Sequence, residues 1–124
     1  MQSRSRSGSG SGQPDQARTE HSVTIRIIAG EWRVVLADDE SQSDVEARRG
    51  DRIRWIVEGS DASFQFPDDK VVGHSTRKVR DGNPLVLAIT NDAATGTHPY
   101  AVFIHKDQTF ARGQSPPRII VMQI

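Results

Sequence analysis

A repeated alternation of apolar and polar residues, with a period of two, constrains this chain more than any other feature. It is clearest over residues 96–104, where Tyr100, Val102 and Ile104 share one parity and His98 shares it too. Successive side chains of a β-strand point to opposite faces of the sheet, so this run predicts a strand with one face in a core.

The same alternation recurs along the chain and predicts an all-β sandwich of seven or eight short strands. The other alternating segments are 23–28, 32–36, 45–47, 53–57, 63–66, 85–89 and 118–124. Turn residues separate several of them, and no segment shows a convincing helical period. Residues 68–80 are polar and are predicted to be irregular.

The alternation also predicts which side chains are buried. The expected core members are the large apolar residues of one parity: Ile25, Ile27, Trp32, Val34, Ile53, Trp55, Tyr100, Val102, Ile104 and Val121. Arg26, Arg33, Arg52 and Arg54 have the opposite parity and are expected to point to solvent. If the arginines were inside instead, every register would be wrong by one residue.

Composition limits the partners of the chain. Its 124 residues include 16 basic and 16 acidic ones, so no net charge attracts nucleic acid or an anionic membrane. No apolar run approaches the roughly 20 residues of a membrane span, and no apolar signal segment follows Met1. The sequence as written therefore predicts a cytoplasmic protein, or a periplasmic or secreted one if a signal peptide has been removed. The oligomeric state stays open.

Two regions differ sharply in composition. Residues 1–20 are rich in glycine, serine and arginine and predict a disordered tail or linker, because such a segment buries too little apolar surface to offset its backbone entropy. Residues 21–124 are predicted to form one β-sandwich domain.

Several chemistries are excluded or disfavoured. The chain has no cysteine, which removes disulfides, thiolate metal sites and cysteine nucleophiles. His21, His74, His98 and His105 show no ligand-pair spacing, so no metal or other cofactor is expected. The Gly-x-Ser-x-Gly pattern occurs only within residues 8–12, outside any strand-turn-helix context, and no enzyme activity is expected.

Two motifs, which follow each other along the chain in the same order as in the family, resemble those of the cupredoxins. This family of small Greek-key β-sandwich proteins includes the blue-copper electron carriers. The first motif is Val45-x-Ala47-x-x-Gly50-Asp51-x-Ile53-x-Trp55, and the second is Gly96-Thr97-x-x-Tyr100-x-Val102-x-Ile104. The resemblance covers roughly residues 23–124 and implies a cupredoxin-like fold. The embedded Arg49-Gly50-Asp51 matches an integrin-binding tripeptide by its letters, and is interpreted as a turn that the fold needs.

The resemblance also implies where copper ligands would stand. The first histidine falls near 62–63, with Ser63 chosen, and the cysteine falls on Ile104. The second histidine falls on Asp107 and the weak axial methionine near Arg112. None of the four ligand types is retained, and a type 1 copper site depends on its thiolate. The resemblance therefore implies a cupredoxin-like fold that has lost its copper.

The leading hypothesis is a non-enzymatic binding or assembly module. Its expected contact surface is the pair of loops at the former copper pole, 61–63 and 105–117, which would take another protein as partner. Phe110 is a candidate anchor, although folding back over the core is the favoured interpretation of its position.

Two other hypotheses stay open. One is a metal-binding or electron-transfer protein with a site of histidines and carboxylates. The other is an immunoglobulin-like sandwich that only mimics the cupredoxin pattern. The resemblance makes a geometric prediction as well: the side chains of Ser63 and Ile104 should lie together at one pole, covered by Asp107 or Arg112, which could pair with each other.

Overall fold

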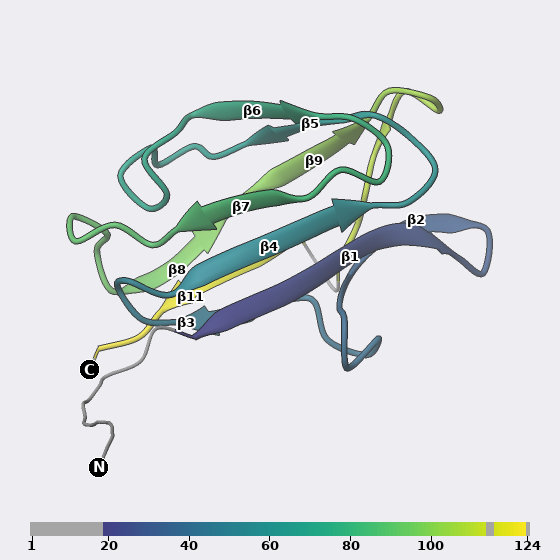
Figure 1. Cartoon of the computed structure of the whole chain (residues 1–124). Helices are drawn as coiled ribbons and strands as arrows, with labels where there is room; N and C mark the ends of the chain where they lie inside the picture. Colours follow the sequence, from purple (N-terminus) through teal and green to yellow (C-terminus); the bar gives the residue numbers. More distant parts are fainter. Residues whose placement is uncertain (1–18, 114–115, 124) are drawn as a thin grey trace, which may run out of the picture.

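The computed structural model describes residues 19–113 and 116–123, and this part of the chain is all-β (Figure 1). It contains eleven strands and no helix, so no helix there is long and apolar enough to cross a membrane. The all-β fold class predicted from the sequence is confirmed. The predicted disorder of the tail falls on 1–18 and lies outside the described residues, whereas Glu20 already belongs to a strand.

The strands are short. Their bounds are β1 (Glu20–Ile28), β2 (Glu31–Leu36), β3 (Val45–Ala47), β4 (Arg52–Val57), β5 (Ala62–Gln65), β6 (Thr76–Val79), β7 (Leu85–Ala88), β8 (Gly96–Pro99), β9 (Ala101–Ile104), β10 (Thr109–Phe110) and β11 (Arg118–Val121).

One layer of the sandwich is the sheet β2-β1-β4-β7. β1 pairs antiparallel with β2 and parallel with β4, and β4 pairs antiparallel with β7. The chain therefore leaves β1 through a hairpin, forms β3 in another sheet, and returns as β4 to lie parallel beside β1.

The facing layer consists of the sheets β10-β9-β5-β6 and β3-β11-β8. β8 and β9 follow each other along one bent run, interrupted at Tyr100, whose N–H donates to the carbonyl of Pro117 at 3.0 Å (Figure 1). β3 and β11 form a second parallel pair. Immunoglobulin sandwiches are built mainly from antiparallel pairs, so these two parallel pairs argue against the immunoglobulin-like alternative.

An aromatic cluster fills the centre of the sandwich. The Trp55 ring lies 5.5 Å from the ring of Phe64, 5.8 Å from that of Phe66 and 5.7 Å from that of Tyr100. Trp55 Nε1–H donates to the Tyr100 hydroxyl at 3.1 Å, which gives the buried indole its partner. The Tyr100 hydroxyl oxygen thus serves as the acceptor that lets the Trp55 N–H be buried in the cluster without an unpaired indole donor.

Nine of the ten predicted core residues are buried, and Ile27 is the exception with 52% exposure. Its parity is right, since it pairs with Trp32 across the hairpin. However, the β1–β4 ladder ends at Ile25 and Val57, so Ile27 projects beyond the packed part of the sheet. The four arginines stay outside the core, with Arg52 exposed and the other three half-buried.

The structure has more strands than the seven or eight predicted. β6 lies inside the segment 68–80, which was wrongly predicted to be irregular: it is a partly exposed strand next to β5, without the apolar alternation of a half-buried one. The break at Tyr100 divides one predicted strand into β8 and β9, and the two-residue β10 is too short to leave an alternating pattern.

Replacing Tyr100 with phenylalanine tests the link between the layers. The change Tyr100→Phe removes one oxygen and leaves the buried Trp55 N–H without its acceptor. We expect the free energy of unfolding to fall by about 1–3 kcal/mol, because an unsatisfied buried donor retains its full desolvation cost. Urea denaturation measures this, and an unchanged unfolding free energy would show that the hydrogen bond does not support the core.

Candidate functional site

The pole where the cupredoxin resemblance would place copper ligands lies where β5 and β9 run side by side. Their antiparallel register places Ala62 opposite Ile104 and Ser63 opposite Phe103. Ala62 and Ile104 are both fully buried and face the core. The two regions that the cupredoxin resemblance brings together are therefore neighbours in space.

Ser63, however, does not face Ile104. It lies half-buried on the outer face of the sheet, where its hydroxyl is hydrogen-bonded to His105 Nε2 at 2.7 Å. The prediction that the Ser63 and Ile104 side chains lie together is wrong by one residue, because successive residues of a strand point to opposite faces. On the inner face, Ala62 takes the place that was assigned to Ser63.

Asp107 and Arg112 each close the pole in a different way. Asp107 Oδ2 accepts a hydrogen bond of 2.6 Å from Trp32 Nε1. Arg112 pairs with β2 through its backbone: its N–H donates to the Trp32 carbonyl at 3.0 Å, and its carbonyl accepts from the Val34 N–H at 2.7 Å. No ion pair joins Asp107 to Arg112, both of which the structure describes, so the suggested pairing of the two is not found.

The inner side of this pole is lined by apolar side chains. Ala62, Ile104 and the buried Ala111 offer no lone pair to a metal. Within residues 19–113 and 116–123, no three histidine, aspartate or glutamate side chains come close enough together to hold a metal ion. The pole is a packed end of the sandwich.

Phe110 lies on the outside of the sandwich and does not fold over the core. Its side chain is 50% exposed, and its ring packs edge-on against the ring of Phe103 at 5.1 Å. The favoured core-capping interpretation is therefore wrong, because the following residue, Ala111, takes the inward position at this point of the chain. His105 extends the same outer surface, with its ring 6.0 Å from Phe103.

A mainly apolar pocket of about 410 Å³ adjoins Phe110. The described residues that line it come from the β8–β9 junction, from β10 and from the chain on either side of the loop to β11: Tyr100, Ala101, Phe110, Ala111, Arg112, Gly113, Pro116 and Pro117. The half-buried Phe103, the exposed Phe110 and this pocket form one surface, which we name the Phe110 surface. It lies beside the pole and combines part of the predicted loop 105–117 with residues 100–103.

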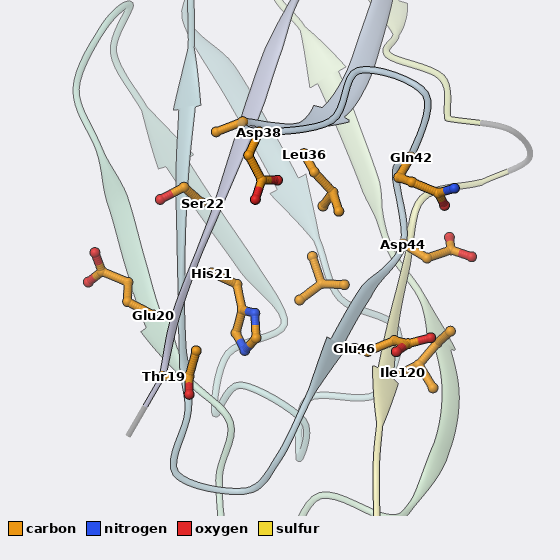
Figure 2. Close-up of a pocket in the computed structure, with 12 residues that line it drawn as sticks. Thr19, Glu20, His21, Ser22, Leu36, Asp38, Gln42, Asp44, Glu46 and Ile120 are labelled. Carbon is orange, nitrogen blue, oxygen red and sulfur yellow. The ribbon is translucent and has the colours of Figure 1, made fainter. Parts of the chain in front are cut away.

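A larger cleft, of about 900 Å³, opens between the first strand and β3 (Figure 2). One wall is the start of β1, including His21, and the other is Val45 and Glu46 of β3 with Ile120 of β11. Leu36 and the turn that follows β2 close one end. The sequence gives no sign of this cleft, because residues 1–20 were predicted to be a tail and His21 is the first residue after it.

Asp51 holds the start of β1 in place beside this cleft. Its carboxylate is only 11% exposed and accepts hydrogen bonds from His21 Nε2 at 3.0 Å, from the Arg48 N–H at 2.9 Å and from the Thr19 N–H at 3.1 Å. Burial alone would raise the pKa of Asp51, but these three donors together hold it below the usual 3.8. The aspartate of the Arg49-Gly50-Asp51 tripeptide is therefore occupied by hydrogen bonds within the domain, which supports a structural role for this turn.

Comparison with known proteins gives similarity in fold only. No protein-family model matches the chain, and no curated protein matches it. Two solved structures of amicyanin, a methionine-to-alanine mutant with Cu(I) and a reduced tryptophan-to-tyrosine mutant, are similar at TM-score 0.47, with 14% and 13% identity and 82% of each chain covered. Fet3p, described as a multicopper oxidase that functions in iron import, is similar at TM-score 0.44 and 16% identity, over 86% of this chain and 23% of that one.

The role of Asp51 predicts how stability depends on pH. Because the folded-state pKa lies below the unfolded value of 3.8, the carboxylate stabilises the fold at pH values above 3.8, and this contribution is lost as the pH falls through the folded pKa. We expect Asp51→Asn to lower the unfolding free energy by about 1–3 kcal/mol at neutral pH, since it removes charged hydrogen bonds.

The difference between Asp51→Asn and the wild-type protein should shrink as the pH is lowered below 3.8, and denaturant titrations at several pH values measure it. The exposed Asp69→Asn is a matched control, which should change stability little at any pH. A difference between Asp51→Asn and wild type that stays constant down to the lowest pH would contradict the assignment.

Proposed function

We propose that this chain is a non-enzymatic binding or assembly module built on a cupredoxin-like sandwich without a type 1 copper site. The observation that carries the proposal is the Phe110 surface, where two phenylalanine rings and an apolar pocket lie together on the outside of a well-packed domain. Large exposed apolar groups beside a pocket are the usual anchors of protein–protein contacts.

The inner side of the pole supports the loss of copper chemistry. The position of the thiolate is occupied by Ile104, and its inward neighbour across the strand pair is Ala62. A buried isoleucine there contributes roughly 1.5–3 kcal/mol of hydrophobic stabilisation. Packing at this end thus replaces the ligands that a metal would need.

The absence of enzyme activity belongs to the same proposal. Ser63 and His105 form a hydrogen-bonded pair that resembles part of a nucleophile and its base. The pair lies on an open sheet face, and among the described residues no carboxylate is hydrogen-bonded to His105 to orient the ring. Without an orienting group, this arrangement favours a surface contact over hydrolysis.

A matched pair of variants tests the binding role. Phe110 and Ile27 are similarly exposed, at 50% and 52%, but only Phe110 lies beside the pocket. We expect a partner protein retained by the wild-type chain to be lost with Phe110→Ala and kept with Ile27→Ala, as measured by quantitative affinity purification. If both variants lost the partner protein equally, the binding would be nonspecific hydrophobic association and not a contact at the Phe110 surface.

Stability measurements separate binding from folding. Phe110→Ala should lower the unfolding free energy by only about 0.5–1.5 kcal/mol, the usual contribution of an aromatic pair. Phe64→Ala, which empties a fully buried position, should lower it by about 3–5 kcal/mol. If the two variants were equally destabilised, Phe110 would be a structural residue and the proposed surface would lose its anchor.

Metal analysis tests the alternative function, a metal-binding or electron-transfer protein with histidine and carboxylate ligands. Protein purified without a metal-affinity step should contain no stoichiometric copper or zinc by elemental analysis. A stoichiometric metal would overturn the proposed loss of the metal site.

A further inference from the structure

Among the residues that the structure describes, several backbone groups at the start of β1 have no partner along the cleft of Figure 2. The ladder between β1 and β2 begins only at Val23 and Leu36. On the other side, β4 bonds to the odd residues of β1, because Arg52 N–H donates to the Thr19 carbonyl at 2.9 Å and Glu58 N–H donates to the Ile25 carbonyl at 2.8 Å. Backbone groups alternate in direction along a strand, so those of Glu20 and Ser22 point away from β4.

Part of this edge is already used. The Ser22 carbonyl accepts from the Ala37 N–H at 2.9 Å, where the chain leaves β2. Within residues 19–113 and 116–123, the Ser22 N–H and both backbone groups of Glu20 have no backbone partner, and they lie where β2 would continue if it were longer. A free strand edge of this kind is a template for another strand.

The opposite wall presents a second free edge. β3 is the outer strand of the sheet β3-β11-β8, and the Ala47 carbonyl bonds to the Met122 N–H of the chain that follows β11, at 2.8 Å. By the same alternation, the backbone groups of Glu46 point away from β11. The cleft is thus a gap between two sheet edges, with the apolar side chains of Leu36, Val45 and Ile120 along it.

The charge of the lining identifies what would enter. The lining carries four carboxylates and no lysine or arginine. Asp44 is paired with Arg118 at 2.5 Å, but neither Asp38 nor Glu46 has an ion-pair partner among the residues that the structure describes. Figure 2 shows Asp38 and Glu46 at separate places around the space that His21 faces. Glu20 likewise has no ion-pair partner among the described residues, so three unneutralised carboxylates lie beside the open strand edge and favour a cationic occupant.

We propose that this cleft binds an extended peptide segment of a partner protein, which adds as a strand beside Glu20 and Ser22 and carries basic side chains that face Asp38 and Glu46. Main-chain hydrogen bonds to the open edge would supply the affinity, as in other cases of strand addition. Alternate side chains would select the sequence: apolar ones pack toward Leu36 and Ile120, and arginine or lysine meets the two carboxylates. This site is separate from the Phe110 surface.

The test uses the full chain and a synthetic probe. The probe is a peptide of about eight residues, the length of an ordinary strand, that alternates arginine and valine and has blocked ends. Titration followed by amide NMR should shift and protect the amides of Glu20, Ser22 and Glu46. Binding should weaken as salt is added, because the carboxylates are exposed. The same peptide with glutamate in place of arginine should not bind.

Variants and a modified probe separate charge from strand addition. The double variant Asp38→Lys with Glu46→Lys should weaken binding by at least about tenfold, since like charges would then face the peptide. Glu58→Lys, at an exposed position outside the cleft, is the matched charge control and should bind much more like the wild type. Methylating alternate amide nitrogens of the peptide keeps its charge but removes its donors, and should abolish binding.

Several results would overturn the proposal. Equal binding of the methylated peptide would mean attraction by charge without strand addition. Chemical-shift changes confined to Phe103 and Phe110 would mean binding at the other surface.

Two further results would identify a different occupant. If the double variant Arg4→Glu with Arg6→Glu changed the amide chemical shifts of Asp38 and Glu46 in the free protein, the N-terminal segment of the chain would be the occupant. If those amides moved on dilution, the occupant would be a second copy. Phe110→Ala should leave peptide binding unchanged, so this test and that of the proposed function can fail independently.

Discussion

The hydrogen bond between Trp55 and Tyr100 is the interaction on which the rest of the structure depends. Trp55 lies on β4 in one layer, and Tyr100 lies where the facing layer bends between β8 and β9. Burial raises the pKa of the Tyr100 hydroxyl, so it stays protonated and polar inside an apolar cluster. Either group alone would be costly there, whereas together they fix the spacing and register of the two layers.

A core fixed in this way leaves the ends and edges of the sandwich free to differ. At the pole, the Trp32–Asp107 hydrogen bond and the backbone of Arg112 join β2 to the segments around β10. The inner space is filled by apolar side chains, and on the outer face the ring of Phe110 packs on the ring of Phe103. This end of the sandwich therefore carries apolar rings on its outer face, which is the surface proposed above as a contact site.

The cleft beside β1 has a different physical origin. It exists because β1 is longer than the partner strand on its outer side, and because β3 is an unpaired edge. Asp51 stabilises this arrangement by accepting hydrogen bonds from His21 and from two backbone N–H groups. The start of β1 is therefore held beside β4 even without a partner strand on its outer side. A rigid open edge loses less conformational entropy on binding than a flexible one would.

Local pattern was enough to predict the all-β class, nearly all of the core and the loss of the thiolate, because side-chain alternation and residue identity are properties of the chain itself. Tertiary structure alone decided whether Ala62 or Ser63 faces Ile104, whether Phe110 or Ala111 turns inward, and that Ile27 overhangs its sheet. It also created the cleft, through a parallel pairing of β1 with β4 that joins residues about thirty positions apart, such as His21 and Ile53. The physical reason is that alternation defines two faces for each strand, whereas register and edges depend on which strands pair, and pairing is determined by contacts between distant parts of the chain.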